Sequence, residues 1–349
     1  MPSGRLLIAA ALVTSFAVVA VLGASPGVSA APDAARDEAP ALAQAPDDLA
    51  VTGWVLQGTR NAVVRRNAGG IDMLSVSGVG ISQDGSEVAA PGRDHRRLLQ
   101  AARRLGLQAE LLVTNYSNRI QGFDPRIAHR LLSSRANIDA VAEQLAGYVV
   151  DGGWDGVNID LERLRGRDAR GLTAFVQALQ DQMPEELTVT VDVSASHSLQ
   201  SYRSRGYRLT ELGAAADVIK LMTYDMHGPT WSRPGPIGDL AWQRRTLEAA
   251  LLAVPPVKVD LGVAGYGYSW PKKRTGTNYS PRTMRAKVER AGVRARWDAD
   301  AGEWTATLPN GTVLWWSDRR SYAKRVDLAR EYGLHGLAVW RIGSADTLR

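Results

Sequence analysis

The chain has 349 residues, a net charge of +6 and no cysteine, which excludes disulfide bonds and thiol chemistry. About 300 residues remain after an N-terminal leader, enough for one eightfold barrel with a large buried core. Basic residues are interspersed with acidic ones, and no nucleic-acid-binding motif occurs, so we expect no binding to nucleic acid.

The first 30 residues have the pattern of a secretory signal peptide. Arg5 precedes an apolar run from Leu6 to Leu22, and residues 28–30 form a small-x-small cleavage site ending at Ala30. Because this run is at the lower limit for spanning a bilayer, an uncleaved membrane anchor is the alternative. Residues 31–50, rich in Ala, Pro and Asp, are expected to form a disordered linker. We therefore expect a secreted or cell-wall-associated protein, with no stable membrane association after cleavage.

Strand-like runs alternate with helical patterns over residues 51–349. The predicted strands are Val51–Leu56, Ile71–Gly80, Ala109–Asn115, Gly156–Glu162, Thr188–Ser194, Val218–Tyr224, Lys258–Tyr266 and Gly336–Ile342. Helical spacing of apolar residues occurs between them, as in Ile138–Val150 and Leu172–Gln182. Eight strands alternating with helices predict an α/β protein with the (β/α)8 TIM barrel fold in a single domain.

The interval between the seventh and eighth predicted strands is too long for one helix. Residues 271 to about 318 contain short alternating runs and a turn at Asn310-Gly311. This pattern predicts a small α+β insertion standing over the mouth of the barrel.

The fourth predicted strand carries two carboxylates. In residues 155–162, DGVNIDLE, strand alternation would place Asn158, Asp160 and Glu162 on the face that reaches the barrel mouth. Side chains two residues apart on a strand are separated by roughly 6 to 7 Å, so both carboxylates could act on one substrate group. The alternative is a solvated strand end that happens to carry acids.

This segment resembles the Asp-Gly-x-Asp-x-Asp-x-Glu signature of glycoside hydrolase family 18. Two more segments are similar to that family, namely Met222–Asp225 on the sixth barrel strand and Gly336–Trp340 on the last. The Asn-Ile-Asp form of the first motif is most similar to the branch of spore-cortex hydrolases and peptidoglycan N-acetylglucosaminidases, as are residues 224–227, 234–237 and 266–270. The resemblance spans about residues 51–343.

The resemblance implies substrate-assisted hydrolysis with retention of configuration and without metal or cofactor. Glu162 would be the general acid, Asp160 would hold the acetamido N–H and stabilise the oxazolinium ion, and Tyr224 would orient the acetamido oxygen. The residues expected to bind substrate are Asn158, Asp225, Trp340, Asn115 and Tyr266. For Asn115, at the end of the third strand, a structural role is an equal alternative.

Asn158 departs from the aspartate that many chitinases of the family carry. We expect its amide to donate a hydrogen bond to Asp160. Because an amide adds no negative charge to the strand face, Asp160 is expected to stay ionised down to mildly acidic pH. The asparagine is therefore an argument against a chitinase, and a weaker argument against glycosidase activity as such.

The sequence thus predicts a monomeric, exported hydrolase of β-1,4 linkages in N-acetylglucosamine-containing glycans, with peptidoglycan as the expected substrate. A chitinase or chitobiase is the alternative enzyme, and a carbohydrate-binding lectin is the alternative of another class, which would not need Glu162. Asp155 and His227 are expected to be structural, and any one of Trp231, Trp270, Trp315 and Trp316 is expected to serve in packing. A nucleotide cofactor is not expected, since Gly265-Tyr-Gly267 is too short for a dinucleotide fingerprint.

Overall fold

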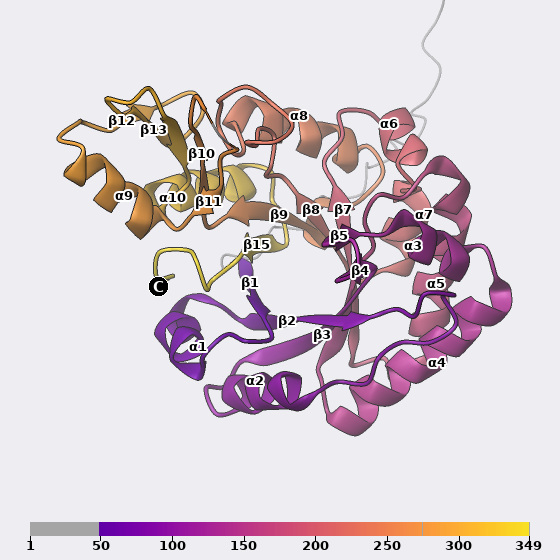
Figure 1. Cartoon of the computed structure of the whole chain (residues 1–349). Helices are drawn as coiled ribbons and strands as arrows, with labels where there is room; N and C mark the ends of the chain where they lie inside the picture. Colours follow the sequence, from indigo (N-terminus) through magenta and orange to yellow (C-terminus); the bar gives the residue numbers. More distant parts are fainter. Residues whose placement is uncertain (1–48, 274, 349) are drawn as a thin grey trace, which may run out of the picture. The chain divides into compact units, whose positions relative to one another are not determined.

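The computed structural model describes residues 49–273 and 275–348, so the expected leader and nearly all of the expected linker lie outside the described residues. Eight parallel strands close into a barrel in the order β1-β15-β9-β8-β7-β6-β3-β2 (Figure 1). They are β1 Ala50–Leu56, β2 Met73–Gly80, β3 Gln108–Thr114, β6 Gly156–Asp160, β7 Thr188–Ser194, β8 Val218–Met222, β9 Val259–Ala264 and β15 Gly336–Trp340. The predicted eight-stranded barrel is therefore confirmed.

Helices surround the barrel. They are α1 Asn61–Asn67, α2 Arg93–Arg103, α3 Pro125–Leu132, α4 Arg135–Gly152, α5 Ala169–Gln182, α6 Leu199–Ser204, α7 Leu209–Ala215, α8 Leu240–Leu251 and α10 Arg319–Glu331, with short 3-10 turns at Ala68–Gly70, Gly166–Asp168 and Pro256–Lys258. Within the described part of the chain, no helix is both long and apolar enough to cross a bilayer.

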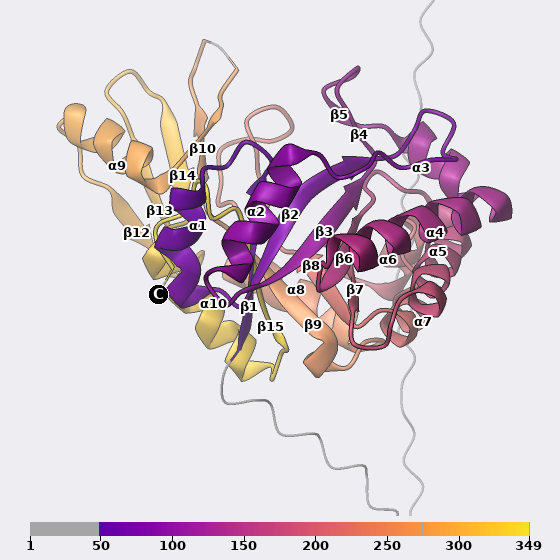
Figure 2. The same cartoon turned by 90° about the horizontal axis from the view of Figure 1, so that it is seen from below.

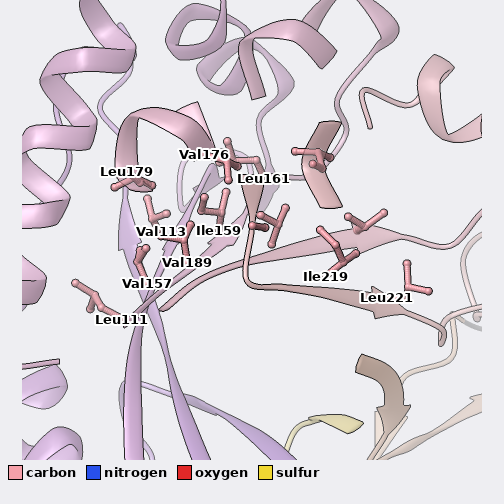
Figure 3. Close-up of a cluster of buried hydrophobic side chains, with 14 of the residues drawn as sticks. Leu111, Val113, Val157, Ile159, Leu161, Val176, Leu179, Val189, Ile219 and Leu221 are labelled. Atoms are coloured by element: carbon pink, nitrogen blue, oxygen red, sulfur yellow. The ribbon is translucent and has the colours of Figure 1, made fainter. Parts of the chain in front are cut away.

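The apolar side chains of β6 pack against helix α5. Figure 3 shows Val157 and Ile159 on the helix side of the strand, together with Val176 and Leu179 of α5, and these side chains are completely buried. Burial of each aliphatic side chain contributes about 1.5 to 3 kcal/mol relative to exposure. This packing turns the alternate residues, Asn158 among them, toward the barrel interior.

The start of β6 is also fixed. Helix α4 ends at Gly152 and is capped by Gly153, whose φ of 67° is left-handed, a conformation that glycine adopts without a Cβ clash. Two residues later the Asp155 carboxylate accepts a hydrogen bond from the Ala109 backbone N–H at 2.8 Å. Asp155 therefore joins β6 to β3 at the amino ends of these strands. Glu162 lies at the opposite, carboxyl end of β6.

Five barrel strands, β3, β6, β8, β9 and β15, end one or two residues earlier than the sequence predicted. The ladder between β3 and β6 stops at the pair Thr114 and Asp160, and β8 ends at Met222. Glu162 and Tyr224 therefore belong to the loops that follow their strands rather than to the strands themselves. Loops at the carboxyl ends of barrel strands build the active sites of TIM-barrel enzymes.

A second sheet is inserted between β9 and β15. Its five strands have the order β11-β10-β14-β13-β12, with bounds β10 Gly267–Trp270, β11 Asn278–Tyr279, β12 Arg296–Asp298, β13 Glu303–Thr307 and β14 Val313–Trp316. Helix α9, Pro281–Arg290, packs on this sheet through Met284 and Val288. The sheet begins at Gly267, before the predicted start of the insertion at residue 271. The insertion and the hairpin of β4 Tyr116–Ser117 and β5 Gly122–Phe123 rise from the same end of the barrel (Figure 2).

A buried ion pair attaches the insertion to the barrel. Glu303 of β13 and Arg325 of α10 have side chains that are only 1% exposed, and the Glu303 carboxylate also accepts the backbone N–H groups of Ile237 and Gly238. These contacts fix the long loop that follows β8, the loop that carries Tyr224 and Asp225.

Candidate active site

Asp160 ends β6 with one carboxylate oxygen unsatisfied. Its Oδ1 atom is buried and has no hydrogen-bond partner among the described residues, while the Thr114 hydroxyl lies 3.5 Å from Oδ2. An unpaired buried oxygen is costly unless a ligand or a proton satisfies it. Asp160 is therefore able to accept a hydrogen bond from a substrate that enters the barrel mouth.

Asn115 holds the backbone of Glu162. Its Oδ1 accepts the Glu162 N–H at 2.9 Å, and its Nδ2 donates to the Glu162 carbonyl at 3.0 Å and to the Asp124 carbonyl at 3.1 Å. The Asn115 side chain is completely buried. Both polar ends of the Asn115 amide bind backbone groups, which favours the structural role over contact with substrate.

The Glu162 side chain has the protonation behaviour of a general acid. Burial raises the pKa of its carboxyl group, the negative charge of Asp225 adds to the increase and Arg163 opposes it, with the result that the pKa is about 7. A carboxyl group with this pKa remains protonated over most of the mildly acidic range. It can then donate its proton to a leaving oxygen near neutral pH.

Asn158 occupies the centre of a hydrogen-bond network inside the barrel. Its Oδ1 accepts hydrogen bonds from the Trp54 indole at 3.0 Å and the Ser75 hydroxyl at 3.2 Å. Its Nδ2 donates to the Thr190 hydroxyl at 3.1 Å and to the Asp192 carboxylate at 2.9 Å. The expectation that Asn158 donates to Asp160 is wrong, because the neighbouring strand provides the acceptor. With no exposed surface, Asn158 also does not contact substrate directly.

Asp192 is the carboxylate that sequence reasoning missed. It lies on β7, is 3% exposed, and has its pKa raised to about 8 by burial, against the opposing effects of Lys220 and Asn158. Lys220 also forms a buried ion pair with Glu110. The alternation in Thr188–Ser194 could have indicated Asp192, since it puts Thr190, Asp192 and Ser194 on one face.

The structure also corrects the expected ionisation of Asp160. Burial raises the pKa of Asp160 well above its usual value, and the charges of Glu162 and Asp192 raise it further. The sequence argument considered only charges on β6 and so omitted Asp192 on β7. The titrations of these neighbouring carboxylates are therefore linked, as expected when like charges lie close together.

The loop after β8 brings Tyr224 and Asp225 over these acids. The four carboxylates Asp160, Glu162, Asp192 and Asp225 lie close enough to Tyr224 to raise the pKa of its hydroxyl, together with the larger effect of burial. Tyr224 is therefore a neutral hydroxyl at the centre of the acid cluster, where it can donate a hydrogen bond.

Asp225 is oriented by Tyr266, which precedes the insertion, and by Tyr268 of β10. Its backbone φ of 60° is left-handed, a conformation that aspartate tolerates better than most residues. The hydroxyl groups of Tyr266 and Tyr268 both donate to its Oδ1 atom, the second at 2.9 Å. These bonds lower the pKa of Asp225, but desolvation of its carboxyl group outweighs them, so the net shift is upward.

Trp340 ends the last barrel strand beside these residues. Its ring packs edge-on to Trp54 with 6.0 Å between the centroids. Trp340 and Tyr266 line a cavity of about 290 Å³ with Asp225 and residues of the insertion. The tryptophan therefore presents part of its apolar ring to the space beside the acids.

Three cavities follow one another across the barrel mouth, and Asp225 lines all of them. The Trp340 cavity adjoins a central one of about 220 Å³ that contains Glu162 and Tyr224. A third, of about 650 Å³, shares Ala195, Arg205 and Trp242 with the central one. Together they form a groove with the acid in its middle, which suits a chain-like ligand.

A TIM barrel with an acid of raised pKa and aromatic residues at the carboxyl ends of its strands has the parts that a carbohydrate-cleaving hydrolase uses. Residues 128–345 match the glycosyl hydrolases family 18, which is more than half of the chain. The chain therefore belongs to this family, and it is a glycoside hydrolase.

Several relatives support the assignment. The chain is 23% identical to the glycosylase YvbX of Bacillus subtilis over 255 residues, 70% of this chain and 74% of that protein. It is 25% identical to the cortical fragment-lytic enzyme of Bacillus subtilis over 251 residues, 67% of this chain but only 56% of that enzyme. Among solved structures, a chitinase from Chromobacterium violaceum superimposes with a TM-score of 0.76 at 26% identity, covering 86% of this chain and 96% of the chitinase.

Proposed function

We propose that the protein hydrolyses the β-1,4 bond that follows an N-acetylglucosamine unit in peptidoglycan, with retention of configuration. The observation that carries the proposal is the pairing of Glu162, whose pKa is about 7, with Asp160 and its unsatisfied buried oxygen two residues earlier. Glu162 would protonate the leaving oxygen. Such a positioned acid typically contributes about a hundred- to ten-thousandfold in rate.

The position of the carboxylates favours the acetamido group of the substrate as nucleophile. In ordinary retaining enzymes the two carboxyl groups face each other across the scissile bond, about 5 to 5.5 Å apart. Asp160 and Glu162 instead follow the same strand and approach the sugar from one side. Asp225 comes from another strand, but two tyrosine hydroxyls occupy its Oδ1 atom. When the acetamido group of the substrate attacks the anomeric carbon, none of these carboxylates has to act as the nucleophile.

Asp160 would then stabilise the transition state by its charge. Its ionised form is disfavoured in the empty site, because burial and neighbouring carboxylates raise its pKa. The positive charge that develops on the oxazolinium ion would reverse that penalty, so the interaction is stronger in the transition state than in the ground state. Tyr224 would donate a hydrogen bond to the acetamido oxygen and direct its attack.

A thiazoline analogue of the oxazolinium ion tests this mechanism. We expect competitive inhibition with an inhibition constant far below the KM of the substrate, because the analogue resembles the intermediate. Addition of a chelator serves as a control and is expected to leave turnover unchanged. Weak inhibition by the thiazoline would contradict the mechanism. So would a loss of activity on addition of the chelator, if added zinc restores the activity.

Peptidoglycan and chitin are the two substrates to distinguish. The similarity to a cortical fragment-lytic enzyme supports peptidoglycan. The 26% identity to a chitinase over nearly its whole length supports chitin as the alternative. Parallel digestion of purified peptidoglycan and chitin, with the new reducing ends identified by mass spectrometry, decides between them. Products from peptidoglycan that end in N-acetylglucosamine support the proposal, whereas products from chitin alone support the alternative.

We further propose an exported enzyme with a cleaved leader at residues 1–30, a linker at 31–50 and a catalytic barrel at 51–349 that carries the insertion at about 271–318. The Arg5 and apolar-run pattern supports the leader. N-terminal sequencing of the protein recovered from culture medium or cell wall is expected to begin at Ala31. Recovery of the intact N-terminus in the membrane fraction would contradict cleavage.

A further inference from the structure

The cavity on the Trp242 side of the groove has the composition of a sugar-binding subsite. The side chains that matter here are Trp231, which is 55% exposed, Trp242, His197 and Arg205. The rings of His197 and Trp242 pack edge-on with 6.0 Å between centroids. Aromatic faces with a few polar groups among them are typical of small-molecule sites.

Arg205 lines this cavity together with the Asp225 carboxylate. Burial lowers the pKa of His197, and the charges of Arg245 and Arg205 lower it further, which shows a positive potential at the ring. Within residues 49–273 and 275–348, no carboxylate oxygen lies within 4.0 Å of the Arg205 guanidinium group.

Two arginines close in sequence to this cavity are paired with carboxylates. Arg208 is paired with Glu211, and Arg244 with Glu331. The Arg205 guanidinium therefore retains its donors for a ligand, and guanidinium binds carboxylates through two parallel hydrogen bonds.

The order of the cavities tells which part of a glycan would lie here. In the proposed function, the sugar that supplies the acetamido group lies over Trp340 and beside Asp160. Glu162 is in the central cavity, which shares three residues besides Asp225 with the His197 cavity and shares only Asp225 with the Trp340 cavity. The bond to be cleaved is thus above Glu162, and the leaving sugar extends toward Arg205.

We propose that the cavity formed by His197, Arg205, Trp231 and Trp242 binds the leaving sugar and selects one that bears a carboxylate, with Arg205 as its partner. This inference rests on the proposed function and adds a basis for substrate choice. Chitin is neutral, whereas the leaving sugar in peptidoglycan carries a lactyl carboxylate, either free or extended by a peptide with carboxylates of its own. A free guanidinium beside the acid discriminates between these glycans.

The test compares three forms of one glycan. Peptidoglycan oligomers stripped of peptides carry the free lactyl carboxylate, the same oligomers after reduction of that carboxylate to an alcohol are neutral, and untreated oligomers keep the peptide. The readout is the ratio of kcat/KM for a carboxylate-bearing form to kcat/KM for the neutral form. We expect Arg205→Gln to lower this ratio about tenfold, in line with loss of a charge-assisted contact.

Two further variants make the result specific. Arg203→Gln removes the same charge from an exposed position of α6 that does not line the cavity, and its ratio is expected to match the wild type. Arg205→Lys keeps the charge but loses the planar fork, and an intermediate ratio is expected. Increasing salt is expected to lower the wild-type ratio and to have little effect on the ratio for Arg205→Gln.

The outcomes separate the two proposals. A fall of the ratio with stripped oligomers identifies the lactyl carboxylate as the ligand, and a fall only with untreated oligomers identifies a peptide carboxylate, both of which support the subsite. Hydrolysis with the same ratio in wild type and Arg205→Gln overturns the subsite alone. Failure of the wild type to hydrolyse any of the three glycans overturns the proposed function and the subsite together.

Discussion

The amide of Asn158 on β6 donates a hydrogen bond to the carboxylate of Asp192 on β7 at 2.9 Å. Each side chain is buried, and the amide completes its hydrogen bonding with Trp54, Ser75 and Thr190. The carboxylate that interacts with Asp160 therefore comes from the neighbouring strand. Although residue 158 is a neutral asparagine, Asp160 still has carboxylates as neighbours, and they raise its pKa.

Asp192→Asn is expected to change how stability depends on pH. The pKa of Asp192 is about 8 in the folded protein, compared with about 3.8 for an unperturbed aspartate. Between these values the unfolded chain releases a proton that the folded chain keeps, so this group lowers the free energy of unfolding as pH rises. The asparagine variant lacks that loss, and its stability relative to wild type is expected to increase from pH 4 to pH 8.

Denaturant unfolding of both proteins at a series of pH values measures this difference. The variant is expected to keep the hydrogen bond from Asn158, because an amide oxygen can replace the carboxylate oxygen as acceptor. A constant difference in unfolding free energy across the range would contradict the raised pKa of Asp192.

Glu162→Gln is expected to reduce kcat by about a hundred- to ten-thousandfold on natural glycans, because the amide cannot donate a proton to the leaving oxygen. Sugar binding, measured by calorimetry with a short oligomer, is expected to persist. Glu143→Gln on the exposed side of α4 is a matched control and is expected to retain full activity. Turnover by Glu162→Gln near the wild-type rate would show that another group is the acid.

The alkaline limb of the kcat/KM profile is expected to report the Glu162 carboxyl group. A general acid must be protonated, so activity is expected to fall as pH rises through its pKa of about 7. Asp225 raises this pKa and Arg163 lowers it. We therefore expect Asp225→Asn to move the limb to lower pH and Arg163→Gln to move it to higher pH. Shifts of both variants in the same direction would exclude Glu162 as the titrating group.

The barrel was predictable because its strands are short, mostly apolar runs at regular spacing, as in Val218–Met222 and Gly336–Trp340. The positions of the acids at the mouth followed from the apolar and polar alternation of residues 155–162. The ends of β6 and β8 were not predictable to the residue, since strand ends depend on where the neighbouring strands stop pairing. The curvature of the barrel decides that, and a local pattern does not record it.

Side-chain contacts between different strands were harder to predict from the sequence than the strand ends. Asn158 and Asp192 are 34 positions apart, and only the pairing of Asn158 with Thr190 in the β6 and β7 ladder brings them together. Arg205 follows a six-residue helix and has no motif that marks it. Sequence reasoning therefore indicated which side chains point inward, while their partners depended on strand order and register.

Asn115 provides a test of whether positioning the acid matters apart from binding the glycan. It fixes the Glu162 backbone through two hydrogen bonds and does not face the groove. Asn115→Ala removes both and leaves buried backbone groups unpaired, which is expected to cost about 1 to 3 kcal/mol of stability for each such group. Because the acid loses its position, kcat is expected to fall about tenfold to a hundredfold while KM changes little.

Asn115→Asp separates positioning from stability. This variant keeps an acceptor for the Glu162 N–H but cannot donate to the Glu162 or Asp124 carbonyl, so we expect kcat between those of wild type and Asn115→Ala. Asn118→Ala, at an exposed site in the neighbouring hairpin, serves as the matched control with unchanged kinetics. A folded Asn115→Ala protein with the kcat of the wild type, whether its KM is unchanged or raised, would show that the contact does not position the acid.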